Sequence, residues 1–341
     1  MTKVIRIDTN KGGNGDIWMR LISLYTISAL VPEYKLIIRI PKVFENIANS
    51  IFSDRLQIST TEFSESNVLY YTSLGIKDLI KPLFLGKRFI SPYQRSIIND
   101  KKKKEFKDQI NLIIFSFTDL LGLVVVPDKK WITAYQGYLD IIAIKNFKSV
   151  KYEDFISQLK LDSNSINNKL LQNTPISKGL SVPKDLNQSL LIFPTGTSRQ
   201  FVPVWWAVKF FPNAYYAFFY KDKETESFIN RGLKVIYFYE EPGDIIYLSK
   251  LSKWTISTDS FPSHLLQYSN AKTTIVLTEV LKSRIISPSF KGIVVDSVAS
   301  CHPCLHMARG IHKLCAAGFE ECINWKNQLY TEKIFNSTHK N

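Results

Sequence analysis

The chain has 341 residues, of which 45% are hydrophobic and 22% are charged, and it contains 22 Phe and 16 Tyr. This composition excludes a disordered chain, and the length favours two domains of about 150 residues each over one core. Lys and Arg (44) outnumber Asp and Glu (30), and the resulting charge of +14 favours anionic partners such as phosphorylated glycolipid, nucleic acid or the inner membrane surface.

No segment of the sequence predicts export or membrane insertion. The first residues carry Lys3, Arg6 and Asp8 and lack an apolar stretch followed by a small-residue cleavage site. The longest apolar runs, at residues 120–127 and 141–144, fall well short of the roughly 20 residues that span a bilayer. We therefore expect a cytoplasmic protein without a transmembrane segment, and peripheral membrane contact and oligomer formation both remain open.

The first half of the chain alternates between short apolar strands and helices. Glycines precede the first helix and are typical of a tight turn at the end of a strand. The expected elements are strands at 4–8, 36–40 and 68–71, a turn at 12–15, and helices that begin at Asp16 and at Val43.

The second half repeats this alternation. Residues 157–188 are rich in Ser, Asn and Lys and contain Pro175, Gly179 and Pro183, which indicates a connection, and we place the domain boundary near residue 185. The expected strands lie at 189–193, 214–220, 235–239, 254–257 and 273–277, and the expected helices at 201–211, 224–231, 262–268 and 324–335.

Alternating strands and helices predict an α/β fold with parallel sheets. We expect two Rossmann-like domains, residues 1–185 and 186–323, which face one another across a cleft, and a final helix and tail at 324–341. In sheets of this kind, ligands bind at the carboxyl ends of the strands. The expected site is the cleft between the domains.

The first turn, residues 12–16, lies at the carboxyl end of the first expected strand. Its glycines would let the backbone approach a ligand, although the spacing differs from the dinucleotide-binding pattern GxGxxG. The neighbouring residues allow two interpretations of Asp16, as a functional carboxylate or as the N-cap of the helix.

Two further turns follow expected strands in the second half. The first contains Thr195, Gly196, Thr197, Ser198 and Arg199, a set of hydroxyls and a cation that suits a diphosphate, or that caps the following helix. The second contains Asp259, Ser260 and His264, with Pro262 at a position suited to the start of a helix. A single His at such a place is usually structural, so the pattern carries more weight than the residue.

These landmarks together resemble glycosyltransferase family 9, the heptosyltransferase-like enzymes of GT-B fold. The resemblance rests on GNGD at residues 13–16, FPTGTSR at 193–199 and TDSFPSHL at 258–265, which span nearly the whole chain in the family's order. Many family members have a glycine where this chain has Phe261, and that glycine lets backbone N–H groups approach the donor phosphate.

The resemblance implies an inverting reaction without a catalytic metal, with ADP-heptose or a related sugar nucleotide as donor. The acceptor would be a lipopolysaccharide core or a protein hydroxyl, bound by the N-terminal domain. Asp16 matches the family's general base, and Gly15 beside it is a candidate donor-binding residue. The turns at 195–199 and 259–264 match the family's phosphate-binding and donor-binding turns, and Arg199 and helix N-termini would stabilise the departing nucleoside diphosphate.

All four cysteines lie in one segment with the spacing C-x2-C-x10-C-x6-C. In a cytosolic chain this clustering favours a metal site over disulfides, and Cys301, Cys304, Cys315 and Cys322 could complete a tetrahedral shell around iron or zinc. The alternative is a set of reduced or transiently oxidised thiols. A similar cysteine-rich finger, with structural iron, occurs in the branch of the family that modifies autotransporter proteins. His302, His306 and His312 are further candidate ligands.

A second hypothesis is a basic nucleic-acid-binding protein without enzymatic activity, in which the positive charge and the cysteine segment form the contact surface. It leaves the three turns at strand ends unexplained, whereas a glycosyltransferase uses all of them. The sequence therefore favours the glycosyltransferase.

Overall fold

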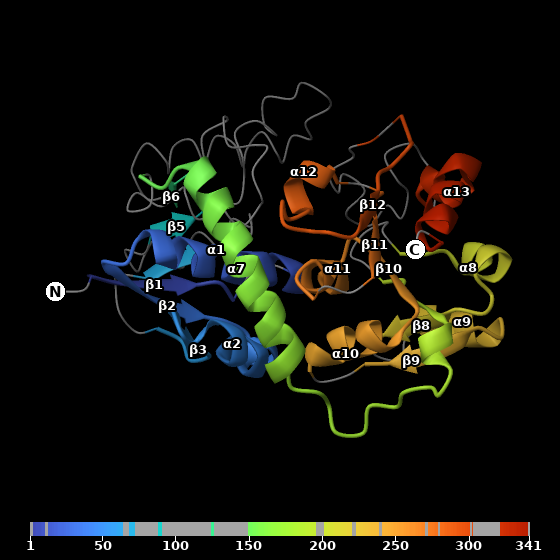
Figure 1. Ribbon diagram of the computed structural model, residues 1–341, viewed down its shortest axis with the longest axis horizontal. Helices are drawn as coiled ribbons and strands as arrows, with labels where there is room; N and C mark the ends of the chain where they lie inside the picture. Colours follow the sequence, from blue (N-terminus) through green and yellow to red (C-terminus); the bar gives the residue numbers. More distant parts are fainter. Residues whose placement is uncertain are drawn as a thin grey trace. The chain divides into compact units, whose positions relative to one another are not determined.

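The computed structural model describes residues 3–10, 13–63, 68–71, 88–90, 124–125, 149–195, 201–219, 223–238, 241–269, 272–278, 280–300, 302 and 321–339 (Figure 1). The chain forms two compact units, Met1–Ser165 and Ile166–Asn341. The division falls inside a helix, whereas the sequence analysis placed it near residue 185.

The first unit contains one parallel sheet. Its six described strands follow the order β3-β2-β1-β4-β5-β6, and each described pair is parallel. The elements are β1 (Lys3–Asp8), α1 (Asn14–Leu30), β2 (Tyr34–Arg39), η1 (Lys42–Phe44), α2 (Glu45–Phe52), β3 (Leu56–Ser59), β4 (Val68–Tyr71), β5 (Arg88–Ile90), β6 (Val124–Val125) and α7 (Tyr152–Asn173), which continues into the second unit.

The second unit repeats this topology in a second parallel sheet. The described order is β12-β11-β10-β7-β8-β9, so the first three strands extend one way from the centre and the next three extend the other way. The elements are η4 (Leu186–Gln188), β7 (Leu190–Phe193), α8 (Val204–Phe210), β8 (Tyr215–Phe218), α9 (Lys223–Asn230), β9 (Lys234–Tyr237), α10 (Gly243–Leu251), β10 (Trp254–Thr258), α11 (Phe261–Leu266), β11 (Thr273–Val276), α12 (Lys282–Ile285), β12 (Ile293–Val295), η5 (Ile323–Lys326) and α13 (Gln328–Ser337).

Both sheets therefore have the doubly wound order, which reverses direction once. The reversal lies between β1 and β4 in the first unit and between β7 and β10 in the second. In such sheets the loops on either side of the reversal diverge and leave space for a ligand at the carboxyl ends of the strands. Each unit thus offers one switch point, and the α/β class with parallel sheets is confirmed.

Apolar side chains fill both units in the pattern that parallel sheets require. β8 and β11 are buried at every position, as expected for strands that are covered on both faces. In the second unit Trp206, Trp325 and Tyr330 join α8, η5 and α13 to the sheet, and the Trp206 indole N–H donates a buried hydrogen bond to Thr331 Oγ1 at 3.0 Å. The C-terminal helix is therefore part of the core of this unit.

Several expectations about individual elements were wrong or incomplete. Residues 157–188 are not all connection, because α7 occupies them as far as Asn173. The sequence analysis omitted β3, β5, β6, α10, α12 and β12, and the last helix begins at Gln328 rather than at Asn324. In the described parts of the chain, no helix combines the length and the apolar character needed to cross a membrane.

Candidate functional site

The switch point of the second unit brings two of the predicted turns together. β7 pairs directly with β10, so Thr195, just after β7, and Asp259, just after β10, lie at neighbouring strand ends. The hydroxyl of Thr258 donates a hydrogen bond to the carbonyl oxygen of Thr195 at 3.1 Å. This bond joins the two turns at the place where a doubly wound sheet binds its ligand.

A buried polar pair lies behind the second turn. His264 Nε2 is 3.4 Å from Asp259 Oδ1, and both side chains are 7% exposed. The other ring nitrogen of His264, Nδ1, is buried and has no hydrogen-bond partner among the described residues. Leaving such an atom unpaired costs about 1–3 kcal/mol. His264 Nδ1 can therefore form a hydrogen bond with a ligand beside the switch point.

Ser260 has a structural role in the same turn. It is the N-cap of α11, where its N–H donates to Ser263 Oγ at 3.3 Å and the Ser263 hydroxyl donates to its carbonyl at 2.8 Å. Phe261 is the first residue of α11 and is half-buried. The structure thus places Thr195, Asp259, Ser260 and His264 at one switch point, whereas Gly196, Thr197, Ser198 and Arg199 lie outside the described residues.

The helix that follows the turn at residues 195–199 begins later than expected. α8 begins at Val204 with Pro203 as its N-cap, rather than at Phe201. Pro203 is in the extended region, which ends the turn before the helix can form. The N-terminus of α8 is therefore separated in sequence from the Thr195–Arg199 turn, which weakens the expectation that its dipole acts on a bound phosphate.

Asp16 is exposed and occupies the first turn of α1. The helix begins at Asn14, so Gly15 and Asp16 are helical rather than part of the preceding loop. Asp16 Oδ2 accepts a hydrogen bond from the N–H of Gly13, the N-cap, at 3.0 Å. The N-cap of α1 is therefore Gly13 and not Asp16, and Asp16 caps the helix from its third position. Its role as a general base stays a prediction.

Sequence reasoning missed a polar cluster at the carboxyl ends of β1 and β2, beside the switch point of the first unit. Asp8, the last residue of β1, is buried and forms an ion pair with Arg39, the last residue of β2, at 2.7 Å. Asp8 also accepts the N–H of Asn10 at 3.0 Å, and the Thr9 hydroxyl donates to the carbonyl of Arg39 at 2.9 Å. The signal was present, because polar residues at the ends of adjacent parallel strands meet at one edge.

Known proteins share this fold at low sequence identity. No protein-family profile matches the chain, and no curated protein matches it significantly in sequence. The family 9 glycosyl transferase of Veillonella parvula superposes with a TM-score of 0.50 and 12% identity, over 88% of this chain and 88% of that chain. The dodecameric iron-containing heptosyltransferase TibC, in complex with ADP-D-β-D-heptose, gives 0.50 and 10% identity over 99% and 77%. The E. coli ADP-heptose LPS heptosyltransferase II gives 0.49 and 14% identity over 86% and 90%.

The chain shares its fold with the Veillonella parvula glycosyl transferase and with TibC. The α/β class and the parallel sheets of the sequence analysis agree with this likeness. At 10–12% identity the likeness concerns the fold and leaves donor, acceptor and catalytic residues to be argued from this chain itself.

Of the four cysteines, the structure describes Cys322. Its side chain is 7% exposed, belongs to the core cluster of Trp325 and Tyr330, and accepts a hydrogen bond from the Asn324 amide at 3.3 Å. Within the described residues, no group of three or more His, Cys, Asp or Glu side chains could hold a metal. Cys301, Cys304, Cys315, His306 and His312 lie outside those residues, so the four-cysteine knuckle is not shown. His302 is described, with Nδ1 at 3.3 Å from the carbonyl oxygen of Thr278.

Proposed function

We propose that the chain is a glycosyltransferase that moves a sugar from a sugar nucleotide, most simply ADP-heptose, to a hydroxyl of a lipopolysaccharide core or a protein. The observation that supports it is the switch point of the second unit, where the turns after β7 and β10 are joined through Thr258 and Thr195. Doubly wound sheets bind nucleotides at this position. The shared fold is consistent with this chemistry.

In this proposal the second unit binds the donor. The hydroxyls of Thr195, Thr197 and Ser198, the backbone of Gly196 and the guanidinium of Arg199 hold the diphosphate. Ser260 and the buried pair of Asp259 and His264 contact the donor from the neighbouring turn. A phosphate or hydroxyl oxygen of the donor could supply the partner that His264 Nδ1 lacks among the described residues.

The proposed reaction is a single displacement at the anomeric carbon. The carboxylate of Asp16 removes the proton of the acceptor hydroxyl as the acceptor oxygen forms its bond to that carbon. The bond from the anomeric carbon to the diphosphate breaks at the same time, and the nucleoside diphosphate leaves with the electron pair, stabilised by Arg199. The configuration inverts, and no catalytic metal is required. Asp16 is exposed in the structure, so a substrate can reach it.

The direct test is thermal unfolding with ADP, UDP, GDP and CMP and their sugar conjugates. A ligand at 100 times its dissociation constant adds about 2.7 kcal/mol to stability. Stabilisation by ADP and ADP-heptose alone supports the proposed donor, and stabilisation by another nucleotide changes the donor within the same reaction class. If no nucleotide stabilises the chain while RNA or DNA binds with steep salt dependence, the proposal is wrong.

We further propose that Cys301, Cys304, Cys315 and Cys322 hold one structural iron or zinc ion. The buried Cys322 thiol with its amide donor suits a thiolate ligand, because a hydrogen bond to sulfur stabilises the negative charge. Elemental analysis of the purified protein should find about one iron or zinc per chain, since four thiolates bind one tetrahedral ion. Cys301→Ser should release this metal, whereas Ser300→Ala, at the neighbouring exposed position, should retain it. Metal-free wild-type protein with full stability would contradict the assignment.

A further inference from the structure

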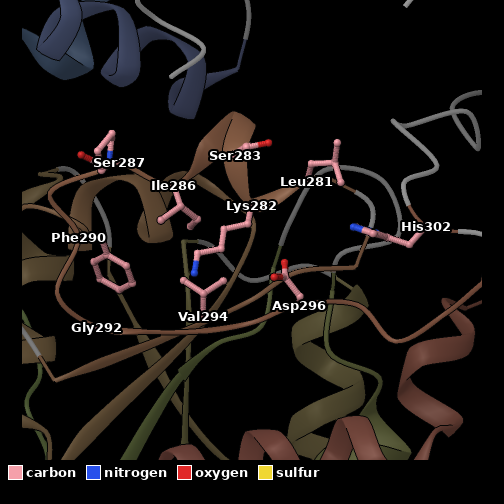
Figure 2. Close-up of a pocket in the computed structure, with 11 residues that line it drawn as sticks. Leu281, Lys282, Ser283, Ile286, Ser287, Phe290, Gly292, Val294, Asp296 and His302 are labelled. Atoms are coloured by element: carbon pink, nitrogen blue, oxygen red, sulfur yellow. The ribbon is translucent and has the colours of Figure 1, made fainter. Parts of the chain in front are cut away.

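A pocket of about 750 Å³ lies beside β12 in the second unit, away from the turns assigned to the donor. Its walls are α12 and the segment that follows it on one side, and β12 with Asp296 on the other (Figure 2). β12 is the last described strand of its sheet, and β11 separates it from β10. Two strand spacings amount to about 10 Å, so the pocket is a place distinct from the switch point.

Two opposite charges face this space. In Figure 2 the Lys282 side chain extends from α12 toward β12, and the Asp296 carboxylate points toward the same space. Both residues are exposed, and neither forms an ion pair with any other residue that the structure describes. The pocket therefore presents an ammonium donor and a carboxylate acceptor to the same ligand.

The floor of the pocket is apolar and held in place. Ile286, Phe290 and Val294 line it and pack against the buried cluster below. Gly292 makes this possible, because a Cβ there would lie 2.3 Å from the Phe290 ring and 2.5 Å from the carbonyl oxygen of Thr273. The floor therefore offers an apolar surface to a ligand.

The wall that carries Lys282 is fixed as well. The buried side chain of Gln267, just after α11, donates to the carbonyl of Ile285 at 3.1 Å and accepts the N–H of Ser287 at 2.5 Å. These two bonds hold the end of α12 against α11. The pocket is thus preformed, which lowers the entropic cost of binding.

We propose that this pocket binds a sugar that carries a phosphate group. The Lys282 ammonium pairs with the phosphate, the Asp296 carboxylate accepts hydrogen bonds from ring hydroxyls, and the apolar floor packs against the ring. The volume exceeds that of one monosaccharide and falls within the usual range of ligand pockets, about 300–1,000 Å³. This binding does not depend on the proposed function.

The test is calorimetric titration with glucose 6-phosphate, glucose and inorganic phosphate, each with and without saturating ADP. Lys282→Gln should weaken glucose 6-phosphate binding about tenfold, because a charge-assisted hydrogen bond is lost. Lys291→Gln is the matched control, since Lys291 is exposed and lies between two lining residues without lining the pocket itself. Equal losses in the two variants would mean nonspecific attraction to a basic chain and would overturn the proposal.

Asp296→Asn gives a second, independent readout. Loss of the carboxylate removes hydroxyl contacts and also removes repulsion of phosphate, so the ratio of glucose 6-phosphate to inorganic phosphate affinity should fall several-fold. An unchanged ratio, or competition with ADP, would overturn the proposal. Tighter binding of trehalose 6-phosphate than of glucose 6-phosphate would support a phosphorylated glycan as the natural ligand, and the reverse order would support a free sugar phosphate. If no nucleotide binds, the proposed glycosyltransferase function is wrong. The measurements of sugar phosphate binding would still test the pocket.

Discussion

Asp16 combines a structural contact with a proposed chemical role, and the two can be separated by substitution. Asp16→Asn retains an oxygen that accepts the Gly13 N–H, whereas Asp16→Ala loses it. We expect Asp16→Ala to lower the free energy of unfolding by about 0.5–1 kcal/mol and Asp16→Asn to change it little. Both variants should lose sugar transfer, because neither side chain can accept a proton as a general base.

The measurement combines initial rates of transfer, nucleotide affinity and urea unfolding for the two variants. Donor binding should survive in both, because the proposed donor residues are in the second unit. Glu45 opens α2 and is a half-buried acidic residue in a first helical turn, so Glu45→Gln serves as the control and should keep full activity. Turnover by Asp16→Asn near the wild-type rate would exclude Asp16 as the base.

The places of individual residues were predictable where each residue directly follows a strand that the sequence itself indicates. Thr195, Asp259 and His264 follow strands that could be read from the sequence, and those strands are adjacent in the sheet. The pair of Asp8 and Arg39 was missed because Asp8 was read as a strand residue and Arg39 was assigned to the interior of its strand. A side chain's partner across strands depends on register, which a single sequence does not state.

The sequence did not indicate helix α7 because a polar residue interrupts its apolar face. Its buried face consists of Phe155, Leu159, Asp162, Ile166 and Leu170, a spacing of three and four that matches a helix. The carboxylate in the middle of this stripe, among many Ser, Asn and Lys residues, weakens the apolar period. Tertiary contacts compensate, because Arg55 pairs with Asp162 at 2.9 Å and Gln158 donates to the same oxygen at 2.9 Å.

Asp162 makes the stability of the first unit depend on pH. Burial raises its pKa above the ordinary 3.8, and the nearby Arg55 offsets this only in part. The folded state therefore binds the proton more tightly than the unfolded state, so this group lowers stability as the pH rises from 3.8 through the raised pKa. Asp162→Asn keeps an acceptor for Arg55 and cannot ionise.

The stability of Asp162→Asn relative to wild type should therefore increase with pH across that interval and then level off. Urea unfolding at several pH values from 4 to 8 measures this difference. Asp154→Asn is the control, since Asp154 is an exposed carboxylate on the same helix, and a pH dependence shared by both variants would not come from the burial of Asp162. A difference for Asp162→Asn that is flat or that decreases with pH would show that Arg55 outweighs burial.

The sequence predicted only in part that the same doubly wound topology occurs in both units. Alternation of strands and helices predicted two α/β halves, but β3 and β12 have four and three residues, too few to show a period. α10 was missed because its buried positions are nearly continuous, so it lacks an amphipathic pattern. The strand order, which locates the switch points, became visible only with the pairing.

Each unit has its own switch point, so nucleotide contacts can be tested in the two units separately. If the second unit alone binds the donor nucleotide, ADP should slow amide hydrogen exchange at the strand ends of β7 and β10, by up to about 100-fold near saturation at 100 times the dissociation constant. The strand ends of β1 and β2, where Asp8 pairs with Arg39, should exchange at the same rate with and without ADP. Exchange followed by mass spectrometry of peptides from residues 3–39 and 190–266 separates the two regions. If ADP protects residues 3–39 and does not protect residues 190–266, the nucleotide contacts lie in the first unit. The assignment of the donor to the turns at 195–199 and 259–264 would then be wrong.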